Sequence, residues 1–217
     1  MPASNPLPPL ITLTTDFGLR DSYVGQMKGR LLSLLPGAAI VDISHELEPF
    51  DILSAAWTLF EAAGWFPDGA IHIAGVDPGV GGARRRIIVQ IRAAERFSFL
   101  VGPDNGIFSV FLSAKQGVRA WSVDDVTRFS HNRPGEFSVF DGRDVFAPIA
   151  AGLGMGIKPE HQEKIFGLFQ TLLPKDQCES TGIGLTIVKK IIESENGRIT
   201  VKSTFGEGST FGFTWNK

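Results

Sequence analysis

Hydrophobic and polar positions follow two different periods along residues 10–112. Short apolar runs rich in β-branched residues predict strands, and they end at Gly, Pro or Asp. The predicted strands are Leu10–Thr15, Ala39–Ile43, Ile71–Val76, Ile87–Ile91 and Phe97–Val101. Apolar residues at helical spacing predict helices at Tyr23–Leu35, Asp51–Trp65 and Ile107–Leu112. In the second helix, Leu53, Trp57, Leu59 and Phe60 are available for packing. Strands that alternate with helices favour a three-layer α/β domain with a largely parallel sheet.

The pattern changes near Gly152–Gly156. A helix is predicted around His161–Leu173, and a second helix runs from Ile183 to its stop at Gly197. Two alternating segments, Ile199–Val201 and Phe211–Trp215, then predict a hairpin. These elements predict a partial α/β sandwich with the order helix, helix, hairpin.

Composition changes at the same place. Residues 1–153 contain eleven Arg, two Lys and seventeen Ala, whereas residues 154–217 contain one Arg, seven Lys and no Ala. One protein seldom chooses its helix formers and surface cations so differently in two halves. We therefore predict two domains, residues 1–153 and residues 154–217. A gene fusion, an engineered joint and a sequence-assembly error would each produce such a seam.

Polar side chains follow several predicted strands of the first domain. Asp16 follows the first strand, Asp77 a central one, and Asp104 and Asn105 another. In open α/β sheets, ligands bind beyond the carboxyl ends of the parallel strands. The sequence therefore predicts a binding site that contains these residues.

Six motifs occur in order over residues 9–153. They are Thr-Thr-Asp-Phe-Gly at 14–18, Tyr-Val-Gly-Gln-Met-Lys-Gly at 23–29, Val-Asp-Ile-Ser-His at 41–45, Val-Asp-Pro-Gly-Val-Gly at 76–81, Pro-Asp-Asn-Gly at 103–106 and Gly-Arg-Asp-Val-Phe-Ala-Pro at 142–148. Together they resemble the S-adenosyl-L-methionine (SAM) hydroxide adenosyltransferases, or SAM hydrolases, which are relatives of the fluorinase and chlorinase. The resemblance implies hydrolysis of SAM to adenosine and L-methionine, with no cofactor.

The resemblance also implies roles for single residues. Asp77 and Arg84 match the first two members of the family's catalytic Asp-Arg-His trio, and position 141 matches the third. Asp16 matches the carboxylate that grips the ribose hydroxyls, and Asp21 a contact to the methionine amino group. Asp104 and Asn105 complete the predicted substrate-binding set.

Position 141 departs from the family pattern. The family usually has Phe-His-Gly-Arg-Asp, whereas this chain has Phe140-Asp141-Gly142-Arg143-Asp144. Two carboxylates at short range tend to share one proton and oppose a hydroxide. We therefore expect Asp141 to impair hydrolysis beside Asp77, and a histidine at position 141 to raise adenosine release.

The second segment resembles the C-terminal part of a histidine-kinase ATP-binding domain. The resemblance rests on Ile165-Phe166-Gly167-Leu168-Phe169, on Ser-Thr-Gly-Ile-Gly-Leu at 180–185 and on the closing Gly-Glu-Gly-Ser-Thr-Phe. It implies four nucleotide-binding glycines, Gly154, Gly156, Gly182 and Gly184. The family's adenine-reading aspartate corresponds to Gly152, and the helix with its magnesium-binding asparagine has no counterpart.

Charge and cysteine content narrow the function classes. A net charge of −2 does not favour nucleic acid or an anionic membrane surface as a partner. The single cysteine, Cys178, excludes an intramolecular disulfide and fits a reducing compartment, so we predict a cytoplasmic protein without a membrane span. No cluster has metal-ligand spacing, so no metal is predicted. The family resemblance also points to a homotrimer.

Three functions remain open from the sequence. The first is SAM hydrolysis, impaired by truncation or by Asp141. The second is an ATP-lid fragment that acts as a nucleotide-binding or interaction module, and only this reading would need ATP and Mg²⁺. The third is a chimera without function.

Overall fold

The computed structural model describes residues 8–93, 96–113, 117–123, 140–155, 184–194, 197–204 and 208–214. The chain divides into two compact units. One unit is Leu7–Gly154, and the other combines Met155–Lys217 with Met1–Pro6.

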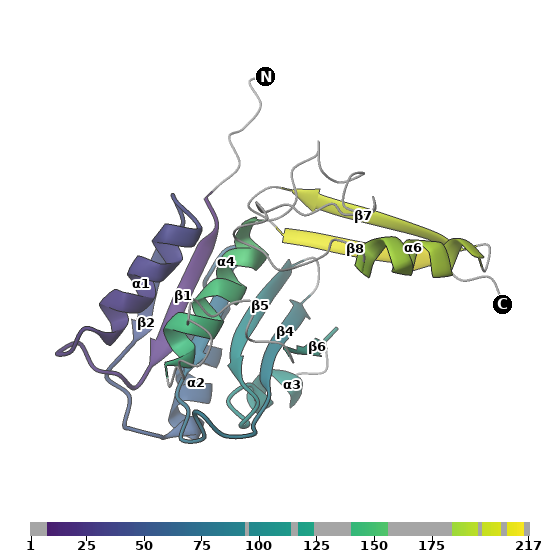
Figure 1. Cartoon of the computed structure of the whole chain (residues 1–217). Coiled ribbons are helices and arrows are strands. Elements are labelled where there is room, and N and C mark those ends of the chain that lie inside the picture. The colour runs from purple at the N-terminus through teal and green to yellow at the C-terminus, as the bar shows by residue number, and fades with distance from the viewer. Residues whose placement is uncertain are drawn as a thin grey trace. The chain divides into compact units, whose positions relative to one another are not determined.

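The first unit begins with alternating strands and helices and continues with three consecutive strands (Figure 1). Its strands are β1 (Leu10–Thr15), β2 (Ala39–Ser44), β3 (Ile71–Gly75), β4 (Arg86–Ala93), β5 (Arg96–Pro103) and β6 (Arg119–Ser122). Its helices are α1 (Tyr23–Leu34), α2 (Ile52–Ala63), α3 (Ser109–Ser113), the π-helix η1 (Gly142–Phe146) and α4 (Ala147–Met155).

The six strands form one sheet in the order β2-β1-β3-β5-β4-β6. The pairs β1–β2, β1–β3 and β3–β5 are parallel, whereas β4 pairs antiparallel with both β5 and β6. The prediction of a largely parallel sheet in an α/β fold is confirmed, because of the six described strands of this sheet β4 alone opposes the common direction.

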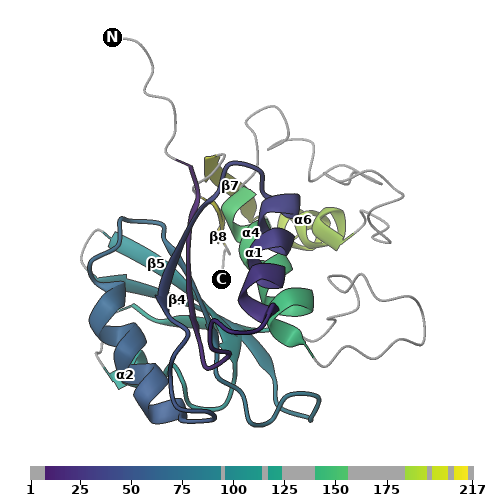
Figure 2. The same cartoon turned by 90° about the vertical axis from the view of Figure 1, so that its left-hand side faces the viewer.

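Helices cover both faces of this sheet (Figure 2). Helices α1 and α4 lie on one face and α2 on the other. The core on the α2 side joins α2 and α3 to the central strands through buried apolar residues that include Leu59, Leu100, Ile107 and Phe108. Burying apolar area in this way is the dominant favourable contribution to folding.

Helix α2 packs through a different face from the one that its large side chains suggested. Its buried residues are Ala55, Ala56, Leu59 and Ala63. Of the predicted packing positions, only Leu59 is buried, while Leu53 and Trp57 are 65% and 50% exposed. Small alanines let the helix lie close to the sheet, and the larger residues are left on its outer side.

The segment from η1 through α4 was not predicted as helical. Its residues are buried on nearly every side, and they include Val145, Phe146, Ala147, Ile149 and Ala150. A helix that is apolar all round has no amphipathic period, which is the signal that sequence reasoning uses. Pro148 near the start of α4 was the one local indication, because proline is favoured in the first turn of a helix.

Gly102 in β5 marks a close approach to the backbone of β3 and to Phe108, the residue before α3. A Cβ atom at this position would lie 2.6 Å from the Ala74 carbonyl oxygen and 2.9 Å from the Phe108 ring. We expect Gly102→Ala to lower the free energy of unfolding by about 1–3 kcal/mol, since overpacking forces backbone shifts. Chemical denaturation measures this, with Gly29→Ala in α1 as control because a Cβ there meets nothing within 4 Å. Equal stability of Gly102→Ala and wild type would contradict the expected clash.

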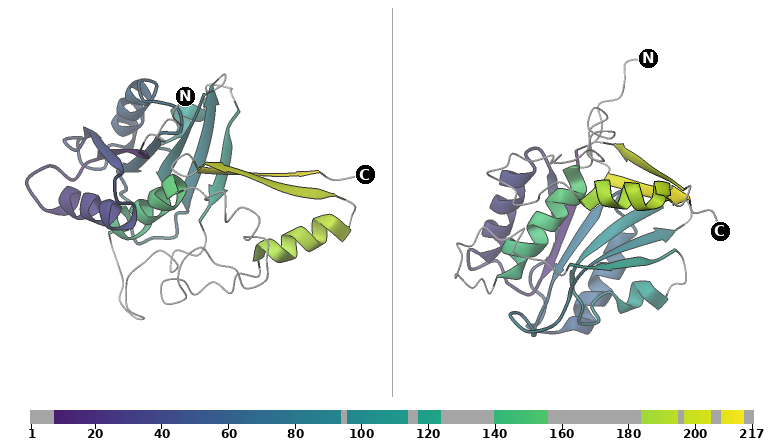
Figure 3. Two further views of the ribbon diagram at one scale, coloured as in Figure 1. Left: turned by 90° about the horizontal axis from the view of Figure 1, so that it is seen from above. Right: turned by 45° about the vertical axis from the view of Figure 1, so that its right-hand side comes forward.

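The second unit contains a helix and a hairpin in its described residues. Helix α6 (Gly184–Ser194) is followed by β7 (Arg198–Thr204) and β8 (Gly208–Thr214), which pair antiparallel. Figure 3 shows α6 alongside the two strands. The predicted second helix and hairpin are therefore present. The predicted helix at 161–173, and the motif residues 165–169 and 180–183, lie outside the described residues.

None of the helices in the described part of the chain has the length and apolar character that a membrane crossing needs. Likewise, the described residues contain no group of three or more His, Cys, Asp or Glu side chains arranged to hold a metal ion.

Candidate functional site

A cavity of about 350 Å³ lies at the carboxyl ends of β1 and β3. Asp16 directly follows β1 and Asp77 follows β3, and these two strands are adjacent and parallel, with Thr15 opposite Gly75. Asp16, Asp77 and Asp141 all line the cavity. The other lining residues are Phe17, Tyr23, Pro49, Phe50, Gly75, Val80, Phe140, Gly142 and Phe146. The volume is that of a small-molecule site with a mainly apolar wall and a few carboxylates.

Arg84 joins two of these carboxylates. Its Nε atom donates to Asp77 Oδ2 at 2.7 Å, and its Nη2 atom contacts the same oxygen. Nη2 also donates to Asp141 Oδ2 at 2.5 Å. The side chains are 8–10% exposed at Asp77 and Arg84 and 5% exposed at Asp141. The structure thus brings together the three residues that the sequence singled out for catalysis.

The guanidinium of Arg84 stays charged in this position. Burial by itself would lower the pKa of Arg84, but the hydrogen bonds to Asp77 and Asp141 outweigh it and raise the pKa above its usual value. The Nη1 atom is buried and has no hydrogen-bond partner among the described residues. A buried N–H donor without a partner is costly unless a water or a ligand satisfies it.

A second arginine at this cluster was missed from the sequence. Arg86 Nε donates to Asp141 Oδ2 at 2.9 Å. Of the run Arg84–Arg86, only Arg84 was assigned a role from the sequence. The spacing of Arg84 and Arg86 was the signal that could have found Arg86, since side chains two residues apart in an extended chain lie on the same side.

Asp16 is held by the loop that precedes α2. Phe50 donates its backbone N–H to Asp16 Oδ2 at 2.8 Å. Phe50 is the only described non-glycine residue with a positive φ, at 66°. Such a backbone conformation is strained for a large side chain and is typical of functional sites.

A buried histidine ties this loop to the end of β1. His45 Nδ1 lies 2.7 Å from Thr15 Oγ1, and its Nε2 lies 3.1 Å from Asp42 Oδ1. The His45 carbonyl also accepts the Gly18 N–H at 2.7 Å. These contacts explain His45 as a structural residue that positions the segment around Asp16.

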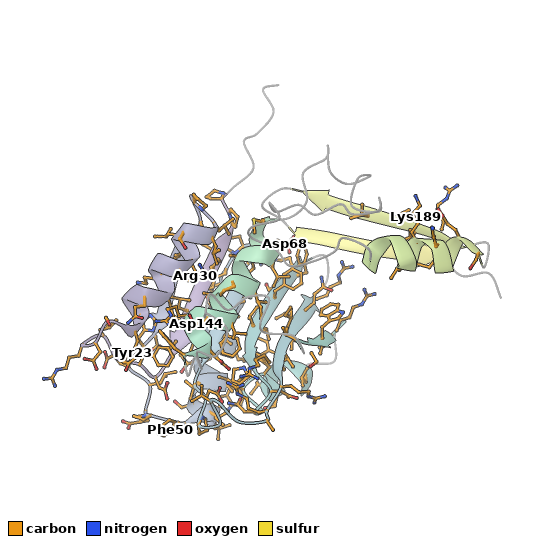
Figure 4. All side chains as sticks on the ribbon, in the orientation of Figure 1. Tyr23, Arg30, Phe50, Asp68, Asp144 and Lys189 are labelled. Carbon is orange, nitrogen blue, oxygen red and sulfur yellow. The ribbon has the colours of Figure 1, made fainter. Side chains whose placement is uncertain are left out.

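Aromatic rings form another part of the cavity wall. Phe140 makes edge contacts with Phe17 and Tyr23, at centroid distances of 5.5 and 5.4 Å. Figure 4 shows Tyr23 and Phe50 at the end of the first unit where the arrow of β1 ends. Phe140 immediately precedes Asp141, so its packing also places that carboxylate.

An ionic network fixes η1, the element that follows Asp141, against α1. Arg143 donates to both oxygens of Asp144 at 2.6 and 2.7 Å, and to Gln26 Oε1 of α1 at 2.6 Å. Figure 4 shows Arg30 of α1 close to Asp144. Gly142 lets η1 pack closely here, since a Cβ would lie 2.9 Å from the Phe140 ring and 3.0 Å from Met27 Sδ.

Other predicted substrate contacts are not brought to the cavity. Asp21 is exposed and does not line it. Asp104 lines a separate cavity of about 210 Å³, where it pairs with Arg85. Asn105 instead donates to the Val76 carbonyl at 3.0 Å, which holds the segment between β3 and Asp77.

The predicted nucleotide-binding glycines are only partly described. Gly154 lies inside α4, where a Cβ would meet Leu35 at 2.8 Å, so it permits close packing and is not in a phosphate-binding loop. Gly184 begins α6. Gly156 and Gly182 lie outside the described residues.

Comparison with known proteins places most of the chain in one family. Residues 11–163 match the model of the SAM hydroxide adenosyltransferase N-terminal domain. The chain therefore belongs to this family. It is 40% identical over 187 residues to the (R)-S-adenosyl-L-methionine hydrolase of Methanocaldococcus jannaschii. The aligned region covers 83% of this chain and 67% of that protein. The crystal structure of an uncharacterized conserved protein from Thermotoga maritima superposes with a TM-score of 0.60 at 36% identity, over 70% of this chain and 56% of that one.

The second segment is similar to a different family. Residues 153–217 match the histidine kinase-, DNA gyrase B- and HSP90-like ATPase model. They are 52% identical over 61 residues to cyanobacterial phytochrome A of Nostoc sp., which covers 28% of this chain and 8% of that protein. The resemblance stated for each segment is thus confirmed. The chain spans between 54% and 67% of the length of the hydrolases it matches.

Proposed function

We propose that this chain hydrolyses SAM to adenosine and L-methionine. The observation that carries the proposal is the cavity in which Asp16, Asp77 and Asp141 meet, with Arg84 bridging the last two. Family membership and the names of the relatives support the same reaction.

In the proposed reaction, a water oxygen bonds to the ribose 5′ carbon while the carbon–sulfur bond breaks. The sulfonium takes up the bonding pair and leaves as neutral methionine, so no general acid is needed. The water proton passes to Asp77, whose Oδ1 accepts one hydrogen bond, from Gly79 N–H at 3.2 Å, and retains a second lone pair. The Nη1 donor of Arg84, which has no partner among the described residues, is suited to hold the oxygen as its charge develops.

The carboxylate of Asp16 is proposed to accept hydrogen bonds from the ribose hydroxyls. Its Oδ2 atom is already oriented by the Phe50 N–H, and pre-oriented groups lose less entropy when a ligand binds. Asp21, Asp104 and Asn105 are left out of the proposed contact set because the cavity does not include them.

Calorimetry of the full chain against SAM, adenosine and ATP tests the proposal. We expect SAM and adenosine to bind more tightly than ATP, and Asp16→Asn to weaken both by about tenfold or more, because a charged hydrogen bond is lost. Glu61→Gln, an exposed position on α2, is the matched control. Adenosine release, followed by chromatography, reports the reaction. Tighter binding of ATP, abolished by Gly182→Ala with Gly184→Ala, would favour the nucleotide-binding module instead.

We further propose that residues 1–153 and 154–217 are separate domains, which the two compact units support. A homotrimer and a cytoplasmic location are proposed with them. The family resemblance supports the first, and the single cysteine supports the second.

A further inference from the structure

The three consecutive arginines before and at the start of β4 have two different environments. Arg85 is 69% exposed and pairs with Asp104 at 2.5 Å. Arg84 and Arg86 are 10% and 21% exposed, and both donate to Asp141. Alternate side chains of an extended segment point to opposite sides. The run is therefore not one solvated face, because two of its three cations turn inward to the same carboxylate.

The charges of this cluster balance only when Arg86 is counted. Asp77 and Asp141 are two largely buried carboxylates that share Arg84. With Arg84 as their only cation, the group would hold one uncompensated negative charge, which is unfavourable away from water. Arg86 supplies the second positive charge through its hydrogen bond to Asp141 Oδ2.

We propose that Arg86 is a positioning residue that neutralises Asp141, so that the Asp141–Arg86 pair takes the place of the histidine that the family resemblance implies at position 141. A neutral imidazole adds no charge beside Asp77, and neither does a paired carboxylate and guanidinium. Because Arg86 shares the charge of Asp141, Asp141 does not draw Arg84 away from Asp77. The Arg84 guanidinium therefore stays aligned on Asp77. This inference rests on the proposed hydrolysis, and it reverses the expectation that Asp141 is simply a defect.

Placing a histidine at position 141 would then lower turnover unless Arg86 is replaced as well. Asp141→His alone removes a carboxylate and leaves Arg84 and Arg86 with Asp77 as their only anion in the cluster. We expect kcat for adenosine release to fall by about fivefold or more, a coupling typical of groups in one ionic network. Asp141→His combined with Arg86→Met removes the unpaired cation as well, and we expect it to recover most of the loss.

The experiment compares wild type, Arg86→Met, Asp141→His and the double variant, with Arg85→Met as the matched control. Steady-state kinetics separate kcat from KM, and calorimetry with adenosine shows whether the cavity still binds. We expect Arg86→Met to lower kcat while adenosine binding stays within about twofold, and Arg85→Met to behave as wild type. A purely structural role would not produce rescue of Asp141→His by Arg86→Met.

Two results would overturn the inference. One is higher turnover of Asp141→His than of wild type, and the other is a double variant whose loss equals the product of the two single losses. Thermal unfolding of the same four proteins covers the case in which wild type does not hydrolyse SAM. Non-additive changes in Tm then support the charge pairing while the proposed function fails, and additive changes reject the pairing itself.

Discussion

Replacing Arg84 by methionine is expected to lower adenosine release by about 100-fold or more, the usual effect of losing a charged donor at the reacting oxygen. Among the described residues, the same change leaves Asp77 without a cationic partner and Asp141 with Arg86 alone. Since both carboxylates are largely buried, we also expect a loss of about 3–5 kcal/mol in the free energy of unfolding.

Arg84→Lys provides the more informative comparison. A lysine ammonium retains the charge. It lacks the planar fork of donors through which the Nε and Nη2 atoms of arginine bond to two carboxylates. We expect Arg84→Lys to recover most of the stability and little of the activity. Chemical denaturation and chromatographic assay of adenosine measure the two effects separately. If Arg84→Met retained wild-type activity, the arginine would have no part in the reaction.

Lowering the pH from 6.5 to 4 is expected to destabilise the first unit through His72. This residue of β3 is fully buried, its Nδ1 lies 2.8 Å from Thr12 Oγ1, and its Nε2 has no hydrogen-bond partner among the described residues. Burial lowers the pKa of His72 from 6.5 to about 4, because a protonated ring there would lose its hydration.

The direction of the pH effect on stability follows from which state of the protein binds the proton. Between pH 6.5 and 4, the unfolded chain takes up a proton that the folded chain does not, so stability falls as pH decreases. The full effect is about 3–4 kcal/mol, from about 1.4 kcal/mol for each unit of pKa difference. Above pH 6.5 both states are neutral and His72 contributes no pH dependence.

His72→Asn tests this assignment because it keeps a polar partner for Thr12 but does not titrate. Denaturation at pH 7.5, 6.5, 5.5 and 4.5 should show a steeper loss of stability for wild type than for the variant. Parallel curves for the two proteins would mean that the acid sensitivity comes from other groups.

Much of the first unit followed from local pattern. The strands β1, β3 and β5 were recognisable because each is a short apolar run, and their buried cores are set by those same residues. Position after a strand also predicted that Asp16 and Asp77 would meet, since parallel neighbours end at one edge of the sheet. The same reasoning predicted that Asp104 would lie in the same site. Its side chain instead pairs with Arg85 and lines a separate cavity.

The sequence alone determined the family, the seam between two unlike segments, and the residue types at the site, because motifs and composition are local properties. Only the tertiary structure decided that α4 is buried, that Arg84 bridges two carboxylates and that Arg86 joins Asp141. Asp141 lies 55 residues from Arg86 along the chain. Contacts at that separation depend on the order of the strands and the packing of helices, and no period within one segment encodes them.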